Sequence, residues 1–179
     1  MPPGIRIVGI RVVVAGATGW TGSAVTKAVL AAPDLDLVAA VARKQAGRDA
    51  GEAIGVAPAG VTLVASLGEA LAAPSDVVVD FTHPSVVKAH ALDALAAGRD
   101  VIVGTSGMSA ADYAEIGVAA DGAGRGVVAA GNFSITATLL ARFAAEAAKY
   151  VPDVEVIDYA SAKKPGVPSG TAREIAERL

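Results

Sequence analysis

The sequence predicts an α/β fold in which a doubly wound parallel sheet is followed by the beginning of a second, mixed α+β domain. Three observations predict it. Short, valine-rich apolar runs alternate with alanine-rich segments of helical composition as far as Ala130. A glycine-rich turn, residues 16–22, stands directly between the first apolar run and the first helical segment. After Gly131 this alternation stops and a long amphipathic segment begins.

Several of the expected elements end at a residue that breaks them. The first strand, 11–15, stops at Gly16, and the helix 23–32 stops at Pro33, whose ring cannot continue a helix. The helix 85–97 is closed by Gly98, as helices commonly are. The other expected strands of the sheet are 35–42, 61–65, 76–80, 100–103 and 126–130, and the other expected helices are 67–73 and 110–120.

The end of the chain is organised differently. Residues 134–150 have the period of one long amphipathic helix, and residues 154–159 (VEVIDY) alternate like a strand with one solvent-facing side. We therefore expect one domain over 1–133 and the beginning of another over 134–179. Because one strand and two helices cannot close an independent core, we expect a fragment or a chain that borrows sheet from a partner subunit.

The composition excludes several classes of function. A net charge of −3 offers no basic surface for nucleic acid, and the absence of cysteine excludes disulfides and thiolate metal sites. We expect no metal. No apolar run reaches membrane-spanning length, and the N-terminal stretch is better interpreted as a strand entering a glycine turn than as a signal peptide. A cytoplasmic protein without membrane partners is the expectation.

The glycine-rich turn predicts a dinucleotide site. Its sequence, GATGWTG, places backbone close to a pyrophosphate at the start of a helix, where unpaired N–H groups and the helix dipole favour an anion. A plain tight turn is the alternative. The candidate phosphate-binding residues are Gly16, Ala17, Thr18, Gly19, Trp20 and Thr21.

The end of the second strand favours NADP over NAD. An acidic residue there would bind the ribose hydroxyls of NAD, but the strand runs into Arg43 and Lys44 instead. Arginine binds phosphate through two hydrogen bonds, so these cations suit a 2′-phosphate. Two solvated charges at a strand end are the alternative interpretation.

The segment 163–172 (KKPGVPSGTA) predicts a second anion site. Ser169 is a good helix N-cap, and Gly170 lets an anion approach the backbone at the helix start. Lys164 lies on the approach and could pair with the same anion or give it a proton. A capped surface helix after a proline-rich turn would have the same sequence.

Together these motifs resemble the dihydrodipicolinate reductase family. The chain carries DFT at 80–82, GTSG at 104–107, NFS at 132–134 and PSGTA at 168–172, in the order and spacing of that family. The resemblance covers the chain from about Arg11 onward. It implies an N-terminal Rossmann domain, a C-terminal domain with a mixed sheet, a homotetramer, and reduction of a cyclic imine-type dicarboxylate in lysine biosynthesis.

The resemblance also implies roles for particular residues. The cofactor would be NADPH, with NADH possible, and Lys164 would be the catalytic residue. Ser169, Gly170 and Thr171 would hold a substrate carboxylate. The nicotinamide pocket would be lined by Phe81, Thr82, Gly104, Thr105, Ser106, Gly131, Asn132, Phe133 and Ser134.

The chain departs from the family at a pair of histidines that normally precedes the lysine. Ala160 and Ser161 occupy those positions, and Gly166 replaces an aspartate. The two histidines of this chain, His83 and His90, lie far upstream; we interpret the first as a loop residue with a possible catalytic role and the second as structural. The expected chemistry is therefore weakened, or the substrate differs.

Three alternatives remain open. The spacing of Tyr159 and Lys163 fits the Tyr-x-x-x-Lys pair of short-chain dehydrogenases, but that pair needs a helix, which Pro165 interrupts. The chain could instead be a nucleotide-binding homologue without reductase activity. It could also reduce another cyclic imine or imino acid.

Overall fold

The computed structural model describes residues 9–130, 132–151, 153–159 and 168–179. The chain divides into two compact units, Met1–Ala129 (unit 1) and Ala130–Leu179 (unit 2). No helix among the described residues is long and apolar enough to cross a membrane.

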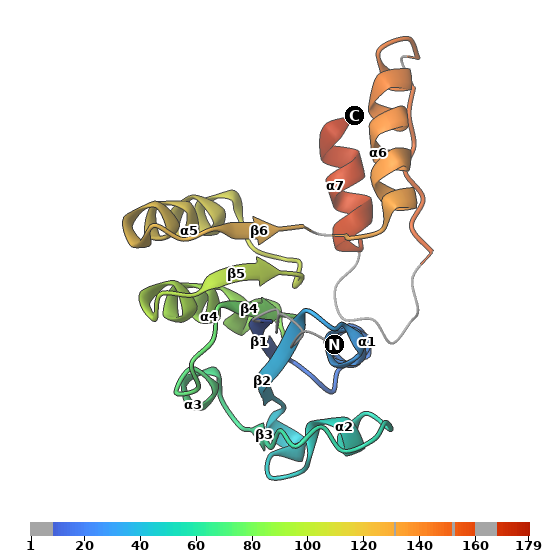
Figure 1. Ribbon diagram of the computed structural model, residues 1–179. Coiled ribbons are helices and arrows are strands. Elements are labelled where there is room, and N and C mark those ends of the chain that lie inside the picture. The colour runs from blue at the N-terminus through green and yellow to red at the C-terminus, as the bar shows by residue number, and fades with distance from the viewer. Residues whose placement is uncertain (1–8, 131, 152, 160–167) are drawn as a thin grey trace, which may run out of the picture. The chain divides into compact units, whose positions relative to one another are not determined.

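Unit 1 contains one six-stranded sheet in which every neighbouring pair is parallel. The strand order is β3-β2-β1-β4-β5-β6 (Figure 1), so the chain winds outward from β1 in one direction and then from β4 in the other. This confirms the doubly wound, Rossmann-type sheet. The strands are β1 (Ile10–Ala15), β2 (Leu35–Val41), β3 (Leu63–Val64), β4 (Val77–Asp80), β5 (Asp100–Val103) and β6 (Val127–Ala129).

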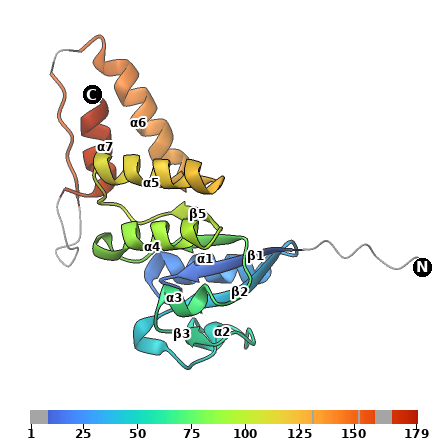
Figure 2. The ribbon, with the colours of Figure 1, turned by 90° about the vertical axis from the view of Figure 1, so that its left-hand side faces the viewer.

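Helices connect the strands and cover both faces of the sheet, as parallel connections require. In unit 1, α3, α4 and α5 lie on one face and α1 on the other (Figure 1). The helices of unit 1 are α1 (Trp20–Ala31), the 3₁₀ helix η1 (Arg43–Gln45), α2 (Ala50–Ala53), α3 (Leu67–Ala70), α4 (Pro84–Ala96) and α5 (Ala110–Ala123). Unit 2 contains α6 (Ile135–Ala148) and α7 (Gly170–Arg178), which lie side by side (Figure 2).

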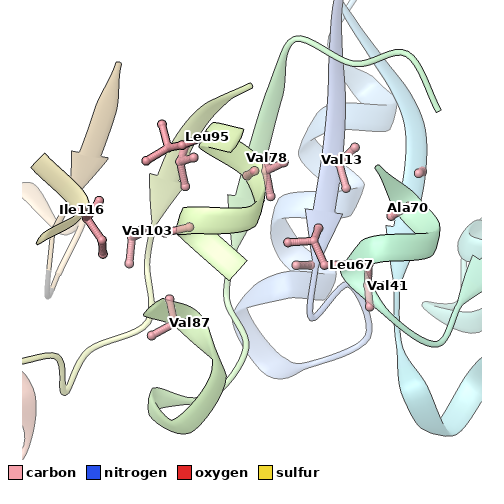
Figure 3. Packing of buried hydrophobic residues seen from close by; sticks show 14 of the residues in the cluster. Val13, Val41, Leu67, Ala70, Val78, Val87, Leu95, Val103 and Ile116 are labelled. Atoms are coloured by element: carbon pink, nitrogen blue, oxygen red, sulfur yellow. The ribbon is translucent and has the colours of Figure 1, made fainter. Parts of the chain in front are cut away.

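The strands are valine-rich because both of their faces are buried. Val13 of β1, Leu95 of α4 and Ile116 of α5 belong to one extended core under α3–α5 (Figure 3). The adjacent Val14 packs on the opposite face, in the core that contains Val29 of α1. The alternation of side chains along each strand thus fills two apolar layers, which hold the carboxyl ends of the strands in fixed positions.

Two expectations about local structure need correction. The first helix begins at Trp20 instead of Ser23, so it starts inside the glycine turn. The expected strand at 154–159 is wrong: residues 153–159 form no strand. A strand requires a hydrogen-bonded neighbour, and within the described residues the six strands of unit 1 pair only with one another. Alternation in the sequence predicts a face but cannot supply that neighbour.

Candidate functional site

The candidate site of unit 1 lies where the winding of the sheet reverses, between β1 and β4. In open parallel sheets, ligands bind outside the carboxyl ends of the strands at such a point. Three loops begin there: Gly16 follows β1, Phe81 follows β4 and Gly104 follows β5. They are joined by hydrogen bonds, since Phe81 N donates to Ala15 O over 3.0 Å and Gly104 N donates to Asp80 O over 2.9 Å. Residues from three of the expected motifs therefore meet at one edge.

The glycine turn requires glycine for two separate reasons. Gly16 has a φ of +80°, and a Cβ at this position would collide with the carbonyl oxygen of Phe81. A Cβ on Gly22 would collide with the carbonyl oxygen of Gly16, so the helix can approach the turn only with glycine at this position. Gly19 N closes the turn by donating to Gly16 O over 2.9 Å. The turn thus holds the backbone at the start of α1 in close contact with the residues that follow β1.

The start of α1 is left open. Its N-cap is Gly19, which offers no side-chain acceptor, and its first turn contains no acidic residue. Each of the other α-helices in the described part of the chain has a side-chain N-cap that accepts from its first turn. Unsatisfied N–H groups and a positive dipole end form an anion site. Trp20, the first helical residue, is 99% exposed, so it does not cover this end.

The two expected cations lie beyond the carboxyl end of β2. Arg43 and Lys44 form η1 with Gln45, and both are exposed. Neither has an acidic partner within the described residues. Arg48 places a third positive charge beside η1, since its Nη1 donates to Gln45 Oε1 over 2.9 Å. We did not predict this residue. The only sequence signal for Arg48 is its position five residues after Arg43.

A buried carboxylate joins the loops after β4 and β5: Asp80, the first residue of the DFT motif, which was not among the expected site residues. Asp80 is 1% exposed, and its Oδ1 accepts from Thr82 N (2.9 Å), Thr82 Oγ1 (2.6 Å) and Thr105 Oγ1 (3.1 Å). Its Oδ2 lies 2.7 Å from His90 Nδ1 on α4. Burial alone would raise the pKa of Asp80, but the hydrogen bonds from His90 and Thr82 outweigh it and lower that pKa. The group is therefore a carboxylate.

The same two loops also pack directly. A Cβ on Gly104 would collide with the ring of Phe81, so the aromatic ring lies flush against the glycine backbone. Thr105 is buried and Ser106 is half-buried. Among the expected nicotinamide-pocket residues of unit 1, the structure thus brings together Phe81, Thr82, Gly104 and Thr105.

Within unit 2, two motifs far apart in the sequence are brought together. Asn132 Nδ2 donates to Thr171 Oγ1 over 3.0 Å, and Asn132 Oδ1 accepts from Ser134 N over 2.7 Å. Ser169 is the N-cap of α7, as expected, because its Oγ accepts from Ala172 N over 3.2 Å. The amide linkage through Asn132 ties the NFS motif to the helix start of the PSGTA motif.

An acidic residue also lies at the start of α7. Asp158 Oδ2 accepts from Ser169 N over 2.6 Å, a contact that the sequence did not suggest. A cleft within unit 2 includes Asp158 and is lined by residues 154–158, by apolar side chains of α6 and α7, and by Ser169 and Thr171. Gly131, Lys163 and Lys164 lie outside the described residues, so the expected catalytic lysine has no described position.

The two residues with alternative roles lie as follows. His83 is exposed and caps α4, with its Nδ1 accepting from Ser85 N over 3.2 Å. Tyr159 is 94% exposed and lies in no helix, whereas the Tyr-x-x-x-Lys arrangement of short-chain dehydrogenases requires one.

In the described chain, no group of three histidine, aspartate or glutamate side chains could hold a metal ion.

Comparison with known proteins gives one consistent result. The family model described as "Dihydrodipicolinate reductase, N-terminus" matches residues 10–133. The 4-hydroxy-tetrahydrodipicolinate reductase of Thermosynechococcus vestitus is 43% identical over 175 residues, which cover 95% of this chain and 63% of that protein. The enzyme of the same name from Desulfitobacterium hafniense is 43% identical over 173 residues, covering 94% of this chain and 64% of the relative.

A solved structure agrees with the sequence matches. The dipicolinate-bound dihydrodipicolinate reductase from Paenisporosarcina sp. TG-14 superposes with a TM-score of 0.74 at 30% identity, covering 95% of this chain and 65% of that one. The chain therefore spans slightly less than two thirds of the length of these relatives.

Proposed function

Since the chain belongs to the dihydrodipicolinate reductase family, we propose that it is a 4-hydroxy-tetrahydrodipicolinate reductase that uses NADPH. Its substrate would be a cyclic imine-type dicarboxylate of lysine and diaminopimelate biosynthesis. The observation that carries this proposal is the open start of α1 behind the glycine turn, at the switch point of the sheet, in a chain that is 43% identical over 175 residues to a named reductase.

The cofactor residues of the proposal are those at the carboxyl edge of unit 1. The backbone from Gly16 to Thr21 would bind the pyrophosphate at the start of α1. Arg43 and Lys44 would bind the 2′-phosphate, and their lack of acidic partners in the described chain supports this role. The bound cofactor supplies hydride. Phe81, Thr82, Gly104, Thr105 and Ser106 would orient its nicotinamide.

The substrate residues of the proposal all belong to unit 2. Ser169, Gly170 and Thr171 would bind one carboxylate at the start of α7, and Asn132 would hold Thr171 in place through the hydrogen bond described above. The relative from Paenisporosarcina binds dipicolinate, a pyridine dicarboxylate, which supports a dicarboxylate ligand. Lys164 would donate the proton that completes reduction of the ring, with water as the alternative donor. A homotetramer is part of the same proposal.

NADPH oxidation by the purified 179-residue chain tests this function, with the substrate generated in the cuvette by its upstream synthase. We expect turnover that dipicolinate inhibits competitively. The Lys164→Ala variant should lose more than about tenfold in kcat with its NADPH affinity nearly unchanged, because the lysine acts on the substrate. Undiminished turnover in this variant would reject Lys164 as the donor.

A second candidate, reduction of another cyclic imine, rests on one observation. Ala160 and Ser161 stand where the family carries its histidine pair, so a proton donor or orienting group is absent. If the chain binds NADPH but shows neither turnover of the dicarboxylate nor inhibition by dipicolinate, this candidate is favoured. NADPH binding without turnover of any imine would instead favour a cofactor-binding homologue.

A further inference from the structure

The most heavily hydrogen-bonded buried charge in the candidate site contacts two residues that the proposed function assigns to the cofactor. Asp80 is the last residue of β4, the strand next to the switch point. It is 1% exposed, yet it accepts from the side chains of Thr82 and Thr105 and from the Thr82 N–H. Thr105 is itself 8% exposed. Nothing in the proposed chemistry uses the carboxylate.

We propose that Asp80 is a positioning residue for the nicotinamide half of the cofactor site, and that His90 on α4 anchors it. This inference rests on the proposed function. The three donors on Oδ1 fix the rotamer of Thr82, the turn that Thr82 begins and the rotamer of Thr105. Both loops thereby take their positions from one carboxylate.

The anchoring by His90 follows from the geometry of the carboxylate. A carboxyl group can rotate about its Cβ–Cγ bond unless both oxygens are held. Oδ1 is held by the two threonines, and Oδ2 is held 2.7 Å from His90 Nδ1. His90 is on the helix that leaves the β4 loop, so the loop is fixed at both of its ends. In this proposal His90 acts only through Asp80 and contacts neither substrate nor cofactor.

The position of the pair also predicts which half of the cofactor it affects. Asp80 joins the loops after β4 and β5, whereas the cations proposed for the 2′-phosphate follow β2. In the sheet, β2 and β5 are separated by β1 and β4. Loss of the carboxylate should therefore weaken nicotinamide binding and leave adenosine binding intact.

The test measures affinity for the whole cofactor and for its adenosine half. NADPH and adenosine 2′,5′-bisphosphate are titrated against wild type, Asp80→Leu and Asp76→Leu, by calorimetry and by the fluorescence of the single tryptophan, Trp20. Asp76 is a matched control, because it is a hydrogen-bonded carboxylate directly before the opposite end of the same strand. We expect Asp80→Leu to weaken NADPH by about tenfold or more and to bind the bisphosphate like wild type. Asp76→Leu should change neither affinity.

Two outcomes overturn the inference. Unchanged NADPH affinity in Asp80→Leu shows that the carboxylate positions nothing. An equal loss for NADPH and the bisphosphate shows a general structural role. If wild type binds no NADPH, the proposed function fails first and the inference fails with it.

A second pair of variants decides the matter if Asp80→Leu does not fold. His90→Leu removes the anchor without touching the proposed site, and His90→Asn restores an N–H donor at nearly the same place. We expect a loss of NADPH affinity of several-fold in His90→Leu, recovery in His90→Asn, and no change for the bisphosphate. Wild-type NADPH affinity in His90→Leu would overturn the anchor.

Discussion

At the scale of single residues, the proposed cofactor site of unit 1 depends on glycines, which have no side chain, and on one buried carboxylate. Gly16 and Gly22 leave room for backbone to approach backbone, and Gly104 leaves room for the ring of Phe81. Asp80 connects the loops after β4 and β5, because its Oδ1 accepts hydrogen bonds from the hydroxyl groups of Thr82 and Thr105. The site is thus shaped largely by close packing against the main chain.

Arg43 offers the clearest residue-scale prediction. We expect Arg43→Asp to lower the preference for NADPH over NADH by about tenfold or more, because a carboxylate repels the 2′-phosphate that the guanidinium would bind. The ratio of the two dissociation constants is the measurement. Arg125→Asp is the control, since Arg125 precedes β6 at the other edge of the sheet and is also exposed. Equal ratios in wild type and Arg43→Asp would remove Arg43 from the cofactor site.

At the scale of elements, α1 is distinguished by the contact of its first turn with the end of β1. Glycine inside a helix normally costs stability relative to alanine. Gly22 lies inside α1 and Gly117 inside α5, so the two positions differ mainly in their neighbours: the carbonyl of Gly16 meets a Cβ at Gly22, and nothing lies within 4 Å at Gly117.

This contrast predicts opposite effects of the same substitution. Gly117→Ala should raise the free energy of unfolding by about 0.5–1 kcal/mol. Gly22→Ala should lower it by about 1–3 kcal/mol and weaken NADPH binding, because the turn must open to admit the methyl group. Denaturant unfolding and cofactor titration measure both. A stabilised Gly22→Ala would contradict the close approach.

The ends of β1 and β4 opposite the site are joined by an ion pair that gives a pH-dependent prediction. Arg11 Nη2 lies 2.6 Å from Asp76 Oδ1, and hydrogen bonds from the Arg11 side chain and backbone lower the pKa of Asp76 to about 2. A lowered carboxylate pKa means stabilisation that is present above the unfolded-state pKa of about 3.9 and lost as the pH falls toward the folded value.

We therefore expect Asp76→Asn to lower Tm at neutral pH. The Tm difference from wild type should shrink as the pH falls from about 4 to about 2, because the wild-type carboxylate is protonated over that range. Since both side chains are partly exposed, added salt should reduce the difference at neutral pH. A Tm difference that stays constant down to pH 2 would show that the carboxylate charge contributes nothing.

The elements also show how far the sequence could predict the structure. Alternating valine-rich runs and the glycine turn identify all six strands of unit 1, since burial on both faces leaves a strong signal. The strand expected at 154–159 is absent: no strand of the described residues pairs with this segment, and alternation in a sequence does not report whether a partner is present. The contact of Asp80 with His90 could not be predicted from the sequence either: ten residues separate them, and the packing of α4 against β4 and β5 brings them together.

At the scale of the whole molecule, the two units divide the proposed work. Unit 1 has a complete sheet with two apolar cores and carries the proposed cofactor residues. Unit 2 has two packed helices and carries the proposed substrate residues Ser169, Gly170 and Thr171. The proposed proton donor Lys164 lies outside the described residues, and the chain covers 63% of the reductase from T. vestitus. Cofactor binding is therefore the part of the proposal for which the structure describes most of the residues.

NADPH binding by the 179-residue chain is therefore the measurement that tests the central claim most directly. Trp20 is the only tryptophan and begins α1, so its emission should be quenched as NADPH occupies the start of that helix. The account predicts saturable quenching by NADPH, weaker binding of NADH, and competition by adenosine 2′,5′-bisphosphate. No saturable change with either nucleotide, together with no heat of binding by calorimetry, would contradict it.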